Sequence, residues 1–120
     1  MGRTPQLERI AIGVPDLDEW IAAFSQILGP GFRKSKVEQS TGTVEIAIHP
    51  AGVEFVRHEA ESARLRSFHL TVDDLGAVQQ QVTRLGWELI DSVELEDRQH
   101  DIYDALGLRI ILVERDAGRV

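Results

Sequence analysis

The chain has 120 residues, of which 42% are hydrophobic and 28% are charged, and its formal net charge is −7. This length predicts a single domain, residues 1–120, and no apolar run approaches the length that spans a bilayer. The negative charge argues against nucleic acids and anionic membranes as partners, because both attract concentrated lysine and arginine. The absence of cysteine excludes disulfides, thiolate metal ligands and cysteine nucleophiles. The N-terminus has no apolar signal core, so we expect a cytoplasmic protein.

The chain opens with a predicted strand followed by a predicted helix. Apolar residues alternate with other residues in LERIAIGV, which predicts a strand over residues 7–14. Asp16 is a suitable helix N-cap, and Glu19 follows three residues later as in a capping box. Apolar residues at helical spacing then predict a helix over residues 17–28, which Gly29 ends.

Three further strands complete the first half, and the second half then repeats the same order of elements. The strands of the first half are predicted at residues 32–38, 43–49 and 52–57. The second half is predicted as a strand, a helix that Asp74 caps and Gly86 ends, and three strands, at residues 65–72, 75–85, 87–95, 98–104 and 108–114.

The two halves keep a nearly constant offset along the chain. Val14 and Val72 are 58 residues apart (72 − 14 = 58), and Gly29 and Gly86 are 57 apart (86 − 29 = 57). Such an offset predicts one supersecondary unit that has been copied. We therefore predict an α+β fold of two tandem β-α-β-β-β modules, at about residues 5–60 and 61–117. Their strands would form a curled mixed sheet around a central cavity, with the helices outside.

The segments LERIAIGVPDLDEW, FHLTVDDL and DALGLRIILVE make the chain resemble the vicinal oxygen chelate superfamily of glyoxalases, bleomycin-resistance proteins, extradiol dioxygenases and methylmalonyl-CoA epimerase. This resemblance covers essentially the whole chain. The likeness is strongest to methylmalonyl-CoA epimerase, through GTVEIAIHP at residues 42–50, and it implies that Glu45 is a catalytic base. Dimers are common in the superfamily, so the resemblance also implies a homodimer, which no residue of the sequence indicates by itself.

The resemblance further implies four positions at which metal-dependent relatives place metal ligands. These positions fall on Arg9, Glu54, Ser67 and Ile111, of which only Glu54 is a good ligand. His69, two residues beyond Ser67, would with Glu54 still leave a catalytic metal short of three protein ligands. We therefore predict no metal and no cofactor.

Glu45 and Arg9 are the first candidates for chemistry. Strand alternation sends Glu45 to the face opposite its apolar neighbours, so it would look into the cavity if the helix packs on the apolar face. There it would serve as a general base; the alternative is a surface glutamate on a half-buried strand. Arg9 would either form a salt bridge with Glu54 or Glu45, or stabilise an enolate or bind a substrate carboxylate.

Polar residues also gather on the strand that opens the second half. Ser67, His69 and Thr71 alternate with apolar residues and would share one face. His69 is a candidate second acid/base group, although a hydrogen-bonded interior histidine is the commoner case. His100 and Tyr103 lie on opposite faces of a later strand, and module symmetry favours an inward His100.

Other conspicuous residues are predicted to have structural or surface positions. His49 and His58 lie beside turns and are predicted at the surface. The acidic segment VELEDRQHD, residues 93–101, is predicted to be a solvated edge or loop. Trp20 and Phe24 belong to the apolar stripe of the first helix and are predicted in the core.

These observations favour a metal-independent epimerase, isomerase or cyclase-like enzyme that uses acid/base chemistry next to a carbonyl of a small molecule. Glu45 would be the base, Arg9 the oxyanion or carboxylate anchor and His69 the proton donor. Substrate-binding positions are predicted at Glu54, Ser67, Thr71, His100 and Ile111. Two alternatives stay open: a non-catalytic protein that sequesters a small molecule, and an atypical metal-dependent enzyme of the glyoxalase family.

Overall fold

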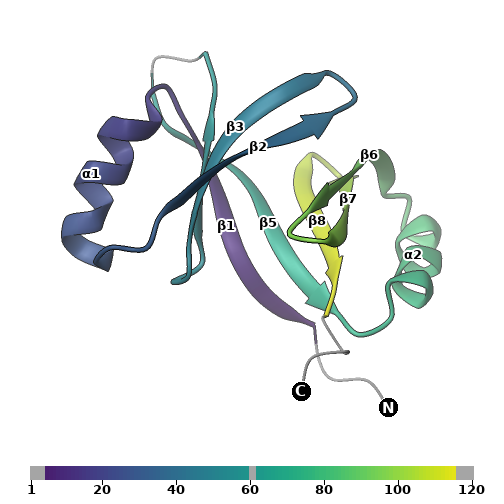
Figure 1. The fold of residues 1–120 in the computed structure, drawn as a ribbon. Coiled ribbons are helices and arrows are strands. Elements are labelled where there is room, and N and C mark those ends of the chain that lie inside the picture. The colour runs from purple at the N-terminus through teal and green to yellow at the C-terminus, as the bar shows by residue number, and fades with distance from the viewer. Residues whose placement is uncertain (1–4, 60–61, 116–120) are drawn as a thin grey trace. The chain divides into compact units, whose positions relative to one another are not determined.

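The structure, a computed structural model, describes residues 5–59 and 62–115 of the chain. The chain divides into two compact units (Figure 1). One unit is formed by residues 9–66, and the other by the described residues from Ser67 onward together with those before Arg9. We call β1–β4 with α1 module one, and β5–β8 with α2 module two.

Module one contains one helix and four strands that hydrogen-bond in the order β2-β3-β4-β1. Strands β4 and β1 are parallel, whereas β2, β3 and β4 pair antiparallel, so the sheet is mixed. The bounds are β1 Gln6–Val14, α1 Leu17–Leu28, β2 Arg33–Gln39, β3 Gly42–His49 and β4 Val53–Arg57.

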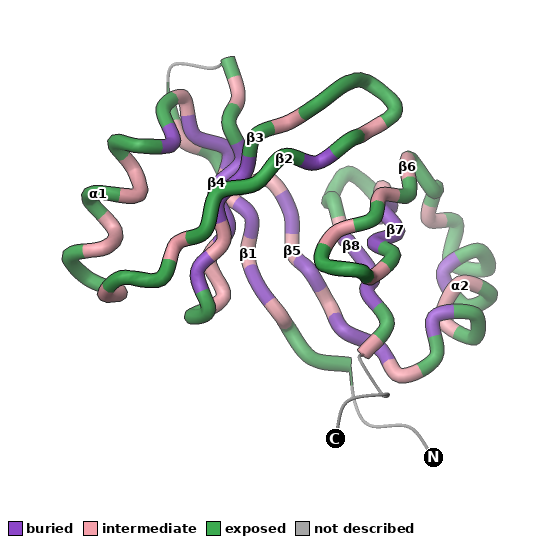
Figure 2. The backbone as a smooth tube through the Cα atoms, viewed as in Figure 1, coloured by how far each residue is buried: buried purple, intermediate pink, exposed green. Residues whose placement is uncertain are grey.

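Module two repeats this plan, with the strand order β5-β8-β7-β6 and one parallel pair, β5 with β8. The bounds are β5 Arg64–Val72, α2 Leu75–Arg84, β6 Glu88–Leu95, β7 Arg98–Ala105 and β8 Leu108–Glu114. The predicted α+β class and the two β-α-β-β-β modules with mixed sheets are therefore confirmed. Strands β1 and β5 even share the same succession of exposed, half-buried and buried positions (Figure 2).

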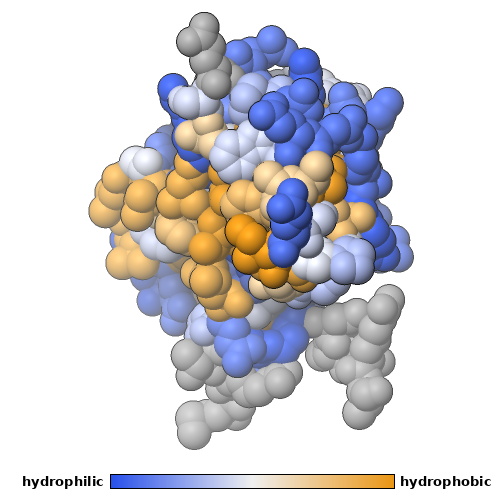
Figure 3. Space-filling model, turned by 90° about the vertical axis from the view of Figure 1, so that its left-hand side faces the viewer, coloured by the Kyte–Doolittle hydropathy of each residue, from blue (hydrophilic) through white to orange (hydrophobic). Residues whose placement is uncertain are grey.

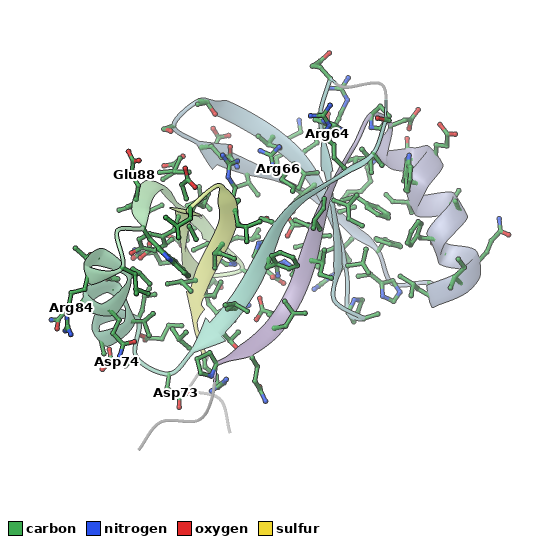
Figure 4. All side chains as sticks on the ribbon, turned by 180° about the vertical axis from the view of Figure 1, so that it is seen from behind. Arg64, Arg66, Asp73, Asp74, Arg84 and Glu88 are labelled. Carbon is green, nitrogen blue, oxygen red and sulfur yellow. The ribbon has the colours of Figure 1, made fainter. Side chains whose placement is uncertain are left out.

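Both helices begin at the predicted aspartates. Asp16 Oδ1 accepts a hydrogen bond from the backbone N–H of Glu19, and Asp74 Oδ1 accepts one from that of Ala77, each at 3.1 Å. These bonds satisfy backbone donors that lack a partner within the first turn. In α2, Asp74 and Arg84 lie at opposite ends of the helix (Figure 4), where their charges complement the helix dipole.

The core of module one is aromatic. Phe55 of β4 is fully buried, and its ring lies 5.1 Å from those of Phe24 and Phe32 and 5.9 Å from that of Trp20, measured between centroids. Aromatic pairs at these separations stabilise a core beyond the area that they bury. Trp20 and Phe24 pack against the buried core from the stripe of α1, as predicted.

The core of module two is mainly aliphatic and packs α2 against β5, β7 and β8. Its one aromatic member at the centre is Tyr103, whose ring lies 6.4 Å from that of Trp87. Burial raises the pKa of the Tyr103 hydroxyl, and the nearby carboxylate of Asp101 adds to this effect. The other buried members are Val72, Leu75, Val82 and Leu112.

Each sheet has a helix face, which packs on its own helix, and an opposite face. In module one, Ile12 pairs with Phe55 on the helix face and Ala11 pairs with Glu54 on the opposite face. In module two, Leu70 pairs with Leu112 on the helix face and His69 pairs with Ile111 on the opposite face. Side chains alternate between these faces along every strand, so each residue can be placed on one of them.

Helix α1 leaves much of its apolar surface uncovered. Leu17 is its one buried residue among those described, and Ile27 is 78% exposed. Figure 3 looks onto the side of the molecule that carries α1 and shows apolar side chains spread across it.

In the described part of the chain, no helix is long and apolar enough to cross a membrane.

Candidate functional site

A buried ion pair occupies the opposite face of module one. Arg9 of β1 and Glu54 of β4 are 4% and 5% exposed, and Arg9 Nε donates a hydrogen bond of 2.6 Å to Glu54 Oε1. The contact arises because Arg9 shares its face with Ala11, the register partner of Glu54 on the neighbouring strand. Two charges removed from water need such a partner, because burying either alone is very costly. Of the partners predicted for Arg9, the structure confirms Glu54.

The residues at the four predicted metal-ligand positions do not fit a divalent metal. Arg9 is a permanent cation, and its guanidinium already engages Glu54, the best ligand of the four. Ile111 has no donor atom, and the neutral hydroxyl of Ser67 is a weak ligand. Among residues 5–59 and 62–115, no three His, Cys, Asp or Glu side chains are placed to hold a metal ion together.

The predicted orientation of Glu45 is wrong. In β3, Ala47 pairs with Phe55, so Ala47 and its alternating neighbour Glu45 lie on the helix face of module one. The apolar residues Ile46 and Ile48 lie on the opposite face instead. The prediction assumed that the helix packs on the more apolar face of this strand. Ala47 is buried on the helix face beside Phe55, whereas Glu45 is exposed.

Glu45 instead lines a polar pocket of about 230 Å³ beside the start of α1. Lys34 and Arg57 contribute cations to this pocket, and Asp16 and Asp18 contribute further carboxylates. Lys34 Nζ donates a 2.8 Å hydrogen bond to Asp18, and this bond raises the pKa of the lysine, with a smaller contribution from the charge of Glu45. The alternative that the sequence left open, a surface glutamate, describes Glu45 correctly.

The opposite face of module two carries the polar group predicted on β5. Ser67, His69 and Thr71 are all buried and share this face, as the register of His69 with Ile111 and of Thr71 with Val113 requires. Thr71 Oγ1 donates a 3.3 Å hydrogen bond to the backbone carbonyl of Gln6. The predicted division of β5 into a polar and an apolar face is therefore confirmed.

His100 joins this polar group from β7. It pairs with Val113, which places it on the opposite face, and its ring centroid lies 5.9 Å from that of His69 with the planes 72° apart. Tyr103 pairs with Ile110 and lies on the helix face. The prediction that His100 rather than Tyr103 would share the face of His69 is confirmed.

Aliphatic side chains of neighbouring strands lie on the same face as the two histidines. Ile111 lies on the same face as His69 and forms a buried cluster with Ile102 and Val113. Val93 of β6 packs against this cluster. Ile111 is therefore placed to contribute an apolar surface beside the imidazoles, and it has no polar atom to offer a ligand.

The predicted solvent exposure of Asp101 is wrong. It belongs to the acidic segment predicted as a solvated edge or loop, yet it is fully buried on the helix face of module two. Its carboxylate accepts hydrogen bonds from Gln79 (2.5 Å), Gln99 (2.6 Å) and Ser92 (2.9 Å). The available signal was its spacing from Tyr103, two residues on, which places both on one face of a strand.

The surface position predicted for His49 is also wrong. This histidine is buried, and its Nδ1 accepts a 3.0 Å hydrogen bond from the backbone N–H of Ala51. Its Nε2 therefore carries the proton and donates to the carbonyl of Gly29 at 3.2 Å. His49 thus connects the end of α1 to the turn after β3 and has a structural role. His58 is half-buried, and its ring lies against Gly13.

No protein-family model and no curated protein sequence matches the chain. Solved structures do match. Methylmalonyl-CoA epimerase from Mycobacterium tuberculosis is 16% identical, with a TM-score of 0.66 over 93% of this chain and 89% of its own. A hypothetical protein from Bacillus halodurans is 17% identical, with a TM-score of 0.70 over 95% and 96%. A halotolerant catechol dioxygenase is 16% identical, with a TM-score of 0.67 over 91% of this chain and 40% of its own.

The chain has the vicinal oxygen chelate fold. Epimerases and dioxygenases share this fold, and at these identities the likeness establishes the fold alone.

Proposed function

We propose that the chain is a metal-independent enzyme that moves a proton next to a carbonyl group of a small molecule. The observation that supports it most directly is the buried Arg9–Glu54 ion pair, which lies at two of the four positions that the sequence resemblance assigns to metal ligands. A guanidinium held at low exposure is a permanent positive charge that stabilises an enolate oxygen or binds a carboxylate. In this proposal Arg9 takes that role, and Glu54 positions it through the bond to Nε.

We assign the proton transfer to His69. Its imidazole is the only kind of side chain whose ordinary pKa lies near neutrality, which suits general acid/base catalysis. Ser67 lies on the same face and offers a hydroxyl group for ligand binding, and Ile111 offers apolar contact, whereas the Thr71 hydroxyl already donates to the Gln6 carbonyl. Glu45 has no part in this proposal, because it is exposed on the helix face of module one.

The ligands of structurally similar epimerases suggest which class of ligand to propose for this chain. One epimerase structure with this fold contains methylmalonyl-CoA and NH4+, and another contains 2-nitronate-propionyl-CoA, whose nitronate resembles an enolate. We therefore propose a carbonyl compound with an acidic hydrogen on the adjacent carbon. A protein that sequesters a small molecule would be expected to stack aromatic rings on it. Here the ring cluster of Trp20, Phe24, Phe32 and Phe55 packs on the helix face of module one, which makes this alternative less favoured.

The proposal is tested by deuterium incorporation from D2O into methylmalonyl-CoA, methylmalonate and pyruvate, followed by proton NMR. Protein dialysed against chelator, with its metal content measured, should incorporate deuterium. His69→Gln should lower the rate by about a hundredfold or more. Glu45→Gln should keep the rate within about twofold, as expected for a residue outside the chemistry.

Three results would contradict the proposal. One is incorporation that requires an added divalent metal, and another is an unchanged rate in His69→Gln. The third is binding of a probe, measured by calorimetry, without any incorporation, which would identify a sequestering protein.

Arg9→Lys is a further variant, since it keeps the positive charge and removes the planar fork of donors. The rate of deuterium incorporation should fall in this variant although the fold is kept.

A further inference from the structure

The opposite face of module two carries a second buried imidazole that the proposed function does not use. His69 and His100 are 3% and 1% exposed, and the two rings meet edge to face. They come from β5 and β7, on either side of β8, so the sheet itself holds them together. Their 5.9 Å centroid separation brings the two rings side by side on one face of the sheet.

One nitrogen of His100 is committed to the backbone. His100 Nδ1 lies 3.0 Å from the carbonyl oxygen of Arg98, and a carbonyl oxygen only accepts hydrogen bonds. Nδ1 therefore keeps its hydrogen in both protonation states, and Nε2 is the atom at which His100 gains or loses a proton. Arg98 is itself held, because its guanidinium forms an ion pair with Glu8 at 3.0 Å.

The residues beside the two imidazoles are mainly apolar, which favours proton transfer to a bound carbonyl over contact of that carbonyl with water. Ile102, Ile111 and Val113 form the buried aliphatic cluster on the same face as the two rings. A carbonyl bound there would be largely removed from water, and hydrogen bonds to it would be stronger than in solvent. The face thus combines two groups that exchange protons with an apolar surface.

We propose that His100 is a second acid/base residue that acts with His69 on a carbonyl ligand bound at the opposite face of module two. This inference rests on the proposed function and adds a residue to it. Neutral His69 takes the proton from the carbon next to the carbonyl. The electron pair of the broken C–H bond forms the C=C bond of an enol, and the carbonyl π electrons move to the oxygen.

The same step consumes the proton of His100. His100 enters as imidazolium, and its Nε2 hydrogen passes to the carbonyl oxygen, which becomes the enol hydroxyl. His69 ends the step as imidazolium and His100 ends it neutral, so charge and protons are conserved. Reversal restores the carbonyl, and exchange of the His69 proton with solvent in between introduces deuterium from D2O.

Two variants of His100 separate chemistry from packing. His100→Phe keeps a ring of similar shape without nitrogen, and His100→Asn keeps an N–H donor for the Arg98 carbonyl without a group that titrates. Each should lower the maximal rate of deuterium incorporation by about a hundredfold, whereas KM for the same probe should change less than about threefold. His58→Phe, a half-buried histidine of module one, should keep the wild-type rate.

Every outcome of this experiment decides the proposal. A wild-type rate in His100→Asn, with that variant folded by circular dichroism, overturns the role of His100 and leaves the proposed function standing. A raised KM with an unchanged maximal rate also overturns it, since this would show a binding role alone. If the wild-type protein incorporates no deuterium into methylmalonyl-CoA, methylmalonate or pyruvate, both the proposed function and this inference fail.

Discussion

Modules one and two carry different chemistry on equivalent strands. In module one, Arg9 and Glu54 bring two opposite full charges to the face opposite the helix. In module two, the residues at the corresponding positions are Ser67 and Ile111, and the buried polar groups of that face include hydroxyls and imidazoles. The backbone plan is shared, because β1 and β5 have the same burial succession, and only the side chains differ.

This difference shows how a duplicated module can divide its tasks. A salt-bridged arginine keeps its charge at every physiological pH, whereas an imidazole changes its charge near neutrality. In the proposed function, module one therefore stabilises charge and module two moves protons. In that proposal, the difference between Arg9 and Ser67 at equivalent positions separates the two roles.

The largest expected effect comes from breaking the charge balance of module one. Glu54→Gln removes the carboxylate charge that faces the buried guanidinium of Arg9, and we expect it to lower the free energy of unfolding by about 3–5 kcal/mol. Urea denaturation measures this change. The matched control is Asp18→Asn, which breaks the exposed Lys34–Asp18 pair at 2.8 Å and should lower the free energy of unfolding far less, because solvent screens an exposed pair. Equal losses in the two variants would show that the Arg9–Glu54 pair is no more important than a surface pair.

An intermediate effect is expected at Asp101, the buried carboxylate of module two. Asp101→Ala leaves the donors of Gln79, Ser92 and Gln99 without their acceptor and should cost about 2–4 kcal/mol. Asp101→Asn should cost about 1 kcal/mol or less, because the amide of Gln79 can turn and present its oxygen to the new donor. A large loss in Asp101→Asn, measured in the same denaturation experiment, would show that the network requires the negative charge.

The smallest expected effect concerns Tyr103 at alkaline pH. Burial raises the pKa of its hydroxyl, so above about pH 10 the unfolded chain loses this proton more readily than the folded chain. The free energy of unfolding therefore falls as the pH rises through this range. In Tyr103→Phe that decline should be shallower by about 1 kcal/mol or less, measured by urea denaturation at pH 8 and pH 10.5. An equally steep decline in the variant would contradict this assignment.

Much of the fold was readable from local patterns. Period-two alternation located the strands, and Asp16 and Asp74 marked both helix starts because a cap needs only a side chain and the first turn. The constant offset between the halves predicted the two modules.

The candidate site could be predicted in part. The burial of Arg9 with Glu54 and the shared face of Ser67, His69 and Thr71 follow from strand alternation within one module.

The sequence by itself determined where the strands and helices lie, that they form two copies of one module, and which residues alternate on each strand. Only the tertiary structure decided which face meets the helix. In β3 that choice depends on the pairing of Ala47 with Phe55, which moves Glu45 away from Arg9 and Glu54. Likewise, the buried positions of His49 and Asp101 depend on hydrogen bonds to residues of other elements. Alternation specifies two faces, but their environments are set by packing between segments far apart in the chain.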